Sequence, residues 1–486
     1  MSLSSSLANA LSGLRVASRS AQVISDNVAN AMTEGFAARR VTINAVTLNG
    51  TGAGARVTGI ERQVDQGLVH DARGSAADAA AATLARAGRA AIETAFGDAE
   101  SPSGLSGRLA AFEARLVEAA ASPGTAQHLN AAARAGAELA DAFRGASGRV
   151  QALRADADRR IASDIATVNA ALAEVASLNR DIRGHFAAGR DASGELDRRQ
   201  AAIDQIAARI PLREVPSGAG EVMLVSTGGA ILLDQRPAVL TFQRATLVGP
   251  ETTLENAALA TIEIEGVPVT MAGPGSLLGG GSLQAAFALR DQTGPEAQAL
   301  LDTLAADLAA RFATPGPDPT LAPGEAGLFT DDGASYDPAD ISGLAARLAF
   351  NEAANPARGG EARLLRDGLA SPAPGPDRPD LLHAMLDSLS EARLPQAPGL
   401  VARPLGLAER LGEALSQVAG ARLAAEASEA HAVARDTTYR DLLAAGGVNT
   451  DEEMSRLLLV EQAFAANARV IQAVDEMMVT LLGIKR

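Results

Sequence analysis

The chain has 486 residues with a formal net charge of −15 at pH 7, and 47% of its residues are hydrophobic, so it can form about two to four domains with sizeable cores. It contains no cysteine, which excludes disulfide bonds and any chemistry that needs a thiolate. The positive charge comes almost entirely from scattered arginines, and this excludes the concentrated basic surface that nucleic-acid binding requires.

The N-terminal segment, residues 3–28, predicts an amphipathic helix. Its apolar side chains follow a heptad pattern along one face, at Leu3, Leu7, Ala10, Leu14, Ala17, Ala21, Ile24 and Val28. The small alanines would let a second helix approach closely. The first residues lack the basic-then-apolar order of a cleaved secretory signal, so we expect a cytoplasmic protein or one exported with its N-terminus intact.

The N-terminal helix is expected to end near Asn27, Asn30 and Gly35, because asparagine and glycine tolerate the left-handed backbone that ends a helix. The residues that follow alternate loosely between apolar and polar side chains. Around Asn49-Gly50 this alternation predicts either a short hairpin or two extended arms.

Residues 75–209 have a predominantly helical pattern, rich in alanine, the best helix former. Glycine and proline interrupt the pattern at several points, so we expect an antiparallel bundle of long helices. From Pro211 to Gly281 the period changes to the alternation typical of strands, which predicts an inserted β-rich module. The run Gly279-Gly280-Gly281 at its end is expected to be a flexible link. Helical spacing returns at residues 283–312 and 405–443.

The last stretch, residues 451–486, predicts one long amphipathic helix. Its apolar face repeats in heptads with one polar break, at Leu457, Val460, Phe464, Asn467, Ile471, Val474, Met478 and Leu481. Such a face must be buried against a second apolar stripe, and the N-terminal helix offers one. We therefore expect the two ends of the chain to pair as a coiled coil. The alternative, two surface helices that pack on separate cores, shows the same periodicity.

These patterns predict a mainly α fold with an inserted β-rich module. The expected division is a coiled-coil stem formed by residues 1–45 with 445–486, a bundle of long helices formed by 46–210 with 282–444, and an outer β module at 211–281. The chain would pass outward through these layers and return through them.

No candidate catalytic, cofactor or metal site emerges from the sequence. The five histidines are far apart, and none has the spacing of metal ligands. Four acidic residues crowd one segment without the order of a calcium loop: Asp331, Asp332, Asp337 and Asp340. Ordinary ion pairs on a helix surface account for the charges of residues 195–199. No stretch approaches the roughly 18 uninterrupted apolar residues of a membrane span, so we expect no membrane insertion.

Six residues at the end of the first helix form a recognisable signature: Asn27, Ala29, Asn30, Thr33, Gly35 and Phe36. It resembles the signature shared by the axial proteins of the bacterial flagellum, the rod, hook and hook-associated proteins. The C-terminal counterpart is the run Glu461 to Ala468 with the residues that follow it to Gly483. Three further features most resemble the hook-associated members: Gly447-Val448-Asn449, the helical segments around Asn179 and Asp197, and the segment with Val57, Ile60, Arg62 and Asp65.

This resemblance implies a non-enzymatic structural protein, an adaptor ring that joins hook to filament. It implies a homo-oligomer that contacts the hook protein and the next hook-associated junction protein, with an export chaperone on the C-terminal helix. Export would leave the N-terminus uncleaved and place the protein outside the cell in the flagellum, where its terminal helices become ordered on assembly.

The nearest alternative is a flagellar hook or distal-rod subunit, although those mostly β proteins would lack the helices of residues 75–209. Two alternatives come from other classes. The chain could be an adhesin that binds a ligand through residues 211–281, or an enzyme with an unfamiliar site, for which the sequence offers no candidate group.

Overall fold

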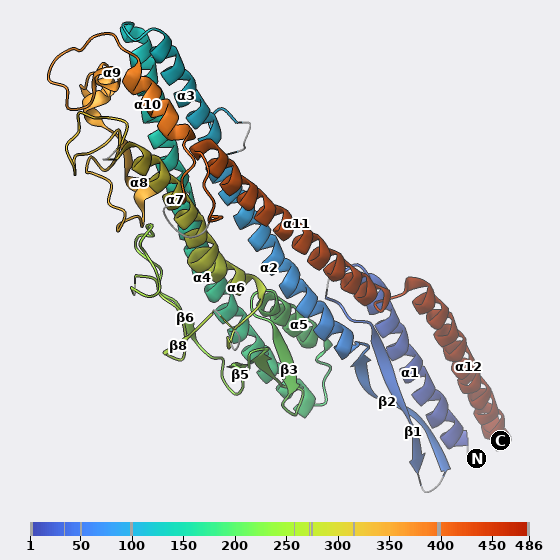
Figure 1. The fold of residues 1–486 in the computed structure, drawn as a ribbon. Helices are drawn as coiled ribbons and strands as arrows, with labels where there is room; N and C mark the ends of the chain where they lie inside the picture. Colours follow the sequence, from blue (N-terminus) through green and yellow to red (C-terminus); the bar gives the residue numbers. More distant parts are fainter. Residues whose placement is uncertain are drawn as a thin grey trace.

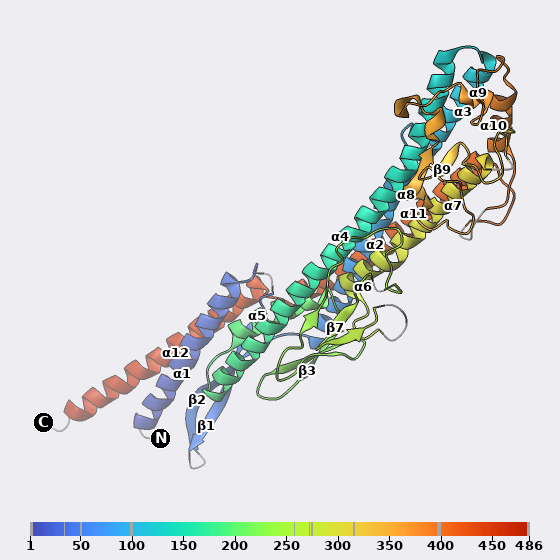
Figure 2. The same cartoon turned by 90° about the vertical axis from the view of Figure 1, so that its left-hand side faces the viewer.

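A computed structural model describes residues 3–33, 35–48, 51–97, 101–256, 258–271, 273, 276–313, 316–395 and 400–483. The molecule is elongated, with both termini at one end (Figure 1) and a group of short helices at the other (Figure 2). The expected fold class, mainly α with small antiparallel sheets, is confirmed. The turn expected at Asn49-Gly50 lies outside the described residues.

The two ends of the chain form what we call the terminal unit, which consists of α1 (Leu3–Ala29), β1 (Arg39–Leu48), β2 (Thr51–Arg62) and α12 (Thr450–Gly483). α1 packs along α12, and the antiparallel hairpin β1-β2 packs along another side of α1. The expected contact between the terminal helices is confirmed. Of the two alternatives for the residues after α1, the hairpin is correct.

Long helices form the rest of the molecule, the helical body: α2 (Gln66–Phe96), α3 (Leu105–Ala121), α4 (Ala126–Ala187), α5 (Ser193–Ala207), α6 (Gly281–Ala288), α7 (Gly294–Phe312) and α11 (Leu407–Ala445). α4 has 62 residues and no proline, so it spans about 93 Å at 1.5 Å per residue. α11 returns antiparallel along α2. Ion pairs join these two helices, Arg86 with Glu429 at 2.8 Å and Arg435 with Asp78 at 2.5 Å.

Two small sheets form the inserted β-rich module, as predicted. One contains β3 (Leu212–Pro216), β4 (Val222–Ser226) and β5 (Ile231–Leu233), and the other contains β6 (Leu240–Thr241), β7 (Ile262–Ile264) and β8 (Val267–Val269). The module lies beside α4, α5 and α6 (Figure 2). Leu172, Ile203, Leu224 and Ile262 are fully buried in the core that the module shares with these helices.

The glycine run at the end of the β module is not the flexible link that the sequence suggested. Gly280 and Gly281 have φ angles of +107° and +66°, which glycine adopts without strain. A Cβ atom on Gly281 would lie 2.4 Å from the carbonyl oxygen of Arg209. The run is therefore a tightly packed turn at the start of α6.

The segment between α7 and α11 folds against the far ends of α3 and α4. Its elements are β9 (Phe329–Asp331), α8 (Leu344–Arg347), β10 (Leu348–Phe350), α9 (Leu364–Asp367) and α10 (Asp380–Ser390), with short 3-10 turns at Glu352–Ala354 and Pro356–Arg358. Phe329 packs edge-on against Phe112 and Phe350, with ring centroids 5.8 and 5.7 Å apart. These rings help to form the larger hydrophobic core.

Two helical stretches would be long and apolar enough to cross a membrane by length and composition alone, within Ala126–Ala187 and within Leu407–Leu481. A core helix of a soluble protein meets the same criterion. The window in the first stretch is 44% buried inside the protein, and the window in the second is 6% buried.

Fully buried arginines connect the β module to the helical body. The Arg290 side chain, which follows α6 in a π-helical turn (Leu289–Thr293), donates to Asp158 at 2.7 Å and to the Ala260 carbonyl at 2.9 Å. Its guanidinium also lies over the rings of Phe242 and Phe287, with 5.5 and 4.9 Å to the centroids. The module is thus held to α4 by charge as well as by its apolar core.

Arg154 of α4 makes a second such connection. Its guanidinium donates to the carbonyl oxygens of Gly249 and Thr252 in the loop between β6 and β7, and to the carbonyl of Arg290. Burial lowers the pKa of this guanidinium from its ordinary value. Because the loop has little regular structure, these hydrogen bonds replace the pairing that a sheet would supply.

We predict that Arg290→Met destabilises the protein by about 3 to 5 kcal/mol, because it leaves the Asp158 carboxylate buried without its cation. Urea unfolding followed by circular dichroism measures the change. The control is Arg159→Met, whose side chain is 57% exposed and pairs with Asp156 one turn away. This control should change the stability by no more than about 0.5 kcal/mol. Equal unfolding midpoints for the two variants would contradict the assigned role of Arg290.

Candidate assembly site in the terminal unit

The heptad face expected on α1 is turned inward. Ala10, Ala17 and Ile24 are buried, at 3%, 5% and 7% exposure. The other predicted residues, Leu3, Leu7, Leu14, Ala21 and Val28, are partly buried. Every predicted position of α1 is therefore at least partly covered within the single chain.

The heptad face expected on α12 is covered less completely. Val474 is buried, and Leu457, Val460, Asn467 and Ile471 are partly buried. The three remaining positions, Phe464, Met478 and Leu481, are exposed by 46%, 46% and 57%. The structure thus brings five of the eight predicted α12 residues against the rest of the chain and leaves three large apolar side chains open to solvent.

Close approach between α1 and α12 depends on a glycine that the heptad analysis did not single out. A Cβ atom on Gly13 would lie 2.6 Å from the side-chain oxygen of Asn467. Asn467 is the polar break in the stripe, and its amide donates to the Ala463 carbonyl of its own helix at 2.9 Å. The polar residue is therefore seated over the one position of α1 that has no side chain.

A different face of α1 binds the hairpin. The Ser12 hydroxyl accepts a hydrogen bond from the Ala55 backbone N–H at 3.1 Å and donates to the Asn9 carbonyl at 2.7 Å. Gly54, with a φ angle of +97°, lies directly on Ser12, because an added Cβ atom would overlap the hydroxyl. These residues carry no pattern in the sequence, so no periodicity could have identified them.

Asn27 of the signature is fully buried, where α1, the hairpin and α12 meet. Its side-chain amide accepts from the Arg39 N–H at 3.0 Å and donates to the Arg39 carbonyl at 2.8 Å. It also donates to the Glu453 carboxylate at 3.2 Å, and Arg456 pairs with the same carboxylate at 2.7 Å. One asparagine therefore fixes the start of β1 and the first turn of α12 relative to the end of α1.

The remaining signature residues form the turn that leads from α1 to β1. The Thr33 hydroxyl donates to the Asn30 side chain at 3.3 Å, and Gly35 has a φ angle of +79°. The Arg39 guanidinium carbon lies over the Phe36 ring, 4.6 Å from the ring centroid. Ala29 is exposed and makes no such contact among the described residues.

The Arg39 guanidinium contacts α5, which lies outside the terminal unit. It donates to Asp197 Oδ2 at 2.8 Å, while Arg62 at the other strand of the hairpin donates to Asp197 Oδ1 at 2.9 Å. The three side chains are only 17%, 15% and 10% exposed for Arg39, Asp197 and Arg62. This carboxylate therefore joins the hairpin to the helical body.

The ion pairs expected on the helix surface at residues 195–199 are only partly present. Arg198 and Glu195 do form a surface pair on one helix, at 3.3 Å. Asp197 instead reaches the hairpin, and Arg199 is buried, donating to Asn179 at 2.9 Å and to the Gly220 carbonyl at 2.6 Å. Burial lowers the pKa of the Arg199 guanidinium. The local sequence could not reveal these partners, because they lie on other elements.

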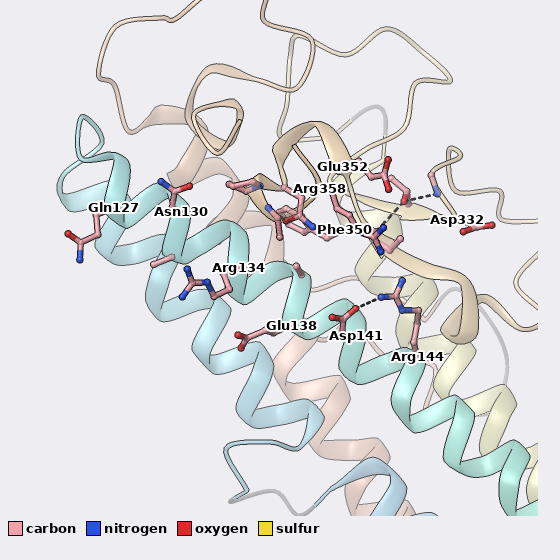
Figure 3. Close-up of a pocket in the computed structure, with 18 residues that line it drawn as sticks. Gln127, Asn130, Arg134, Glu138, Asp141, Arg144, Asp332, Phe350, Glu352 and Arg358 are labelled. Atoms are coloured by element: carbon pink, nitrogen blue, oxygen red, sulfur yellow. Dashed lines mark hydrogen bonds and ion pairs between the residues drawn. The ribbon is translucent and has the colours of Figure 1, made fainter. Parts of the chain in front are cut away.

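A hollow of about 1260 Å³ lies between α4 and residues 330–358 (Figure 3). Its walls carry charges of both signs, and two of the α4 side chains, Asp141 and Arg144, bind each other. No cluster of three or more histidine or acidic residues able to hold a metal occurs among the described residues. At the acidic segment, Asp331 is bound by Arg347 at 2.7 Å. The hollow has no nucleophile and base in hydrogen-bond contact, so its lining gives no candidate for catalysis.

Comparisons with known proteins match two parts of the chain. Residues 90–315 match the helical domain of flagellar hook-associated protein FlgK, and residues 443–484 match the C-terminal region of the flagellar basal body rod proteins FlgEFG. A solved structure, the flagellar hook junction protein FlgK from Burkholderia pseudomallei, is similar with a TM-score of 0.43 and 19% identity. That match covers 54% of this chain and 46% of the other, less than half of its length. No curated protein sequence matches the chain.

The two matched families fall on the features already described. The first spans the end of α2, the helices α3 to α7 and the β module, and the second spans the end of α11 and the heptad face of α12. The signature at residues 27–36 lies outside both matches. Together the matches cover more than half of the chain, and they occur in the order expected from the resemblance. The chain therefore contains a helical domain of the type found in flagellar hook-associated protein FlgK and a C-terminal region of the flagellar rod type, and it is a structural flagellar protein and not an enzyme.

Proposed function

We propose that this chain joins the hook to the filament of the bacterial flagellum as a ring of identical subunits. The observation that carries the proposal is the combination of a FlgK-type helical domain with paired terminal helices in one chain. Two helical lattices built from different subunits cannot be joined by either subunit alone. A junction protein must match the hook protein on one side and the next hook-associated junction protein on the other.

The heptad faces of α1 and α12 serve as the assembly site in this proposal. Phe464, Met478 and Leu481 are exposed by 46%, 46% and 57% in the single chain, although they belong to the same stripe as the buried Val474. Exposed apolar stripes of this kind are typical of surfaces that bind another protein. Neighbouring subunits would cover these side chains, and the terminal helices would become fully ordered at that point.

The same exposed stripe supports an export chaperone as an earlier partner of α12. Before assembly the subunit has to remain soluble, and a large apolar helix face promotes aggregation. A chaperone that covers this face would prevent aggregation until the subunit is exported. We also propose that export leaves α1 uncleaved, because α12 packs along this helix.

We propose the domain division expected from the sequence, with one change. The sequence predicts that residues 1–45 with 445–486 form the stem, that residues 46–210 with 282–444 form the helical domain, and that residues 211–281 form the outer module. We move the first boundary from residue 45 to Arg62, because the hairpin β1-β2 packs on α1 as one piece.

A hook or distal-rod subunit remains the alternative function, and the long helices α2 to α5 argue against it.

We predict that cells without this protein build complete hooks but no filaments and release flagellin into the medium. Filament subunits would then reach the tip of the hook without a surface on which to assemble. Electron microscopy of the cells and detection of flagellin in the supernatant measure this. Absent hooks would favour the rod or hook alternative, and normal flagella would contradict the proposal.

We further predict that Ile471→Asp, and likewise Phe464→Asp, prevents incorporation into flagella while the helical body stays folded. A carboxylate in the apolar stripe would be buried wherever a neighbouring subunit covers it. Each such burial makes the free energy of association less favourable by about 2 kcal/mol or more. The matched control is Gln472→Asp, which adds the same charge at an exposed position of α12. Motility and immunogold labelling of flagella measure incorporation, and circular dichroism checks the fold. Normal incorporation of the Ile471 variant would contradict the assembly role of the stripe.

A further inference from the structure

The chain passes between the terminal unit and the helical body at only two places. One is the short connection of residues 63–65 between β2 and α2, and the other is the turn of residues 446–449 between α11 and α12. The second connection contains Gly446 and Gly447, which carry no side chain to restrict the backbone. Two short connections of this kind leave the angle between the two parts to be set by side-chain contacts.

Asp197 makes the contact best placed to set this angle. Arg39 and Arg62 are directly opposite each other in the register of the hairpin, at its open end. Both guanidiniums converge on the one carboxylate, and each binds a different oxygen. Because all three side chains are largely shielded from water, the pairing is stronger than that of exposed ion pairs.

Arg39 is itself held from three directions. Asn27 binds its backbone N–H and carbonyl, the Phe36 ring supports its guanidinium, and the Gln63 N–H closes the hairpin by donating to the Ala38 carbonyl at 2.8 Å. Asn27 also binds Glu453, so the position of Arg39 is linked to the first turn of α12. The residues that orient Arg39 thus come from α1 and from the turn that follows it, and Asn27 links them to Glu453 of α12.

We propose that Asn27, Phe36, Arg39, Arg62 and Asp197 form a joint that fixes the angle of the terminal unit relative to the helical body. Asn27 is fully buried, so it acts within the chain and not by contact with another subunit. Phe36 and Asn27 position Arg39, and the Asp197 carboxylate accepts a hydrogen bond from the Arg39 guanidinium. With the joint closed, the two parts move as one rigid body. This inference concerns the isolated chain and does not rest on the proposed function.

The test uses double electron–electron resonance on the full-length chain. Because the native sequence has no cysteine, two spin labels can be attached at Asn44→Cys on β1 and Ala173→Cys on α4, both exposed positions. We expect one narrow distance distribution in this parent. Asp197→Asn should broaden it about twofold or more, because two guanidiniums then face each other without a counter-ion. Asn27→Ala should broaden it as well, although Asn27 does not touch α5.

Glu195→Gln is the matched control, since it removes a carboxylate from the same helix as Asp197. Among the described residues, Glu195 pairs with Arg198 of α5 and, at 4.0 Å, with His185 of α4, and both partners belong to the helical body. It should leave the distribution as narrow as in the parent. A second label pair within the helical body, Glu118→Cys with Ala173→Cys, should stay unchanged in every variant and shows that the body is folded. The proposal is overturned if the parent is already broad, if Asp197→Asn or Asn27→Ala leaves it narrow, or if Glu195→Gln broadens it equally.

Discussion

The heptad face of α12 cannot be buried within its own helix, and this constraint shapes the whole chain. A long stripe that matches it lies on α1, and the two ends meet there. Asn27 and Glu453 form a buried hydrogen bond across 426 residues of sequence. Once the ends are joined, the chain between them has to leave and return on the same side. The helical body meets this requirement with antiparallel helices, α2 running outward and α11 running back beside it. Elongation of the molecule follows from the length of these helices.

Away from the terminal unit, buried arginines fix segments that have little regular structure. Only 3% of the residues are aromatic, so few large side chains are present to fill the space between helices and loops. Arg311 illustrates the alternative, because its guanidinium donates to the carbonyls of Ser388, Glu391 and Leu405 and thereby connects α7 with α10 and the start of α11. Arg154 and Arg290 do the same for the β module. A guanidinium has five N–H donors, which suits it to satisfy several loop carbonyls at once.

Periodicity was sufficient to predict the long helices and the β module. It allowed the contact of the terminal helices without deciding it, because two helices that pack on separate cores show the same periodicity. The heptad spacing of α12 and the change of period after Pro211 are local signals, and the structure follows them. The joint could not be predicted in the same way, because Arg39 and Asp197 are 158 residues apart and neither belongs to a stripe. Gly13 and the turn at Gly280 were missed for a related reason. A glycine in a sequence does not reveal whether its missing side chain provides flexibility or room for a neighbour, and here both positions provide room.

The signature becomes understandable from what its residues contact. A motif that ends a helix would need only asparagine and glycine, and Asn30 with Gly35 meets that need. Asn27 and Phe36 are not required to end α1. The Asn27 side chain on α1 reaches both β1 and α12, and an amide can do so because it both donates and accepts. Aspartate would keep the acceptor but bring a second negative charge against Glu453, and leucine would leave the Arg39 backbone groups unpaired. The chemistry at this buried position therefore favours an amide of this length, independently of any contact outside the chain.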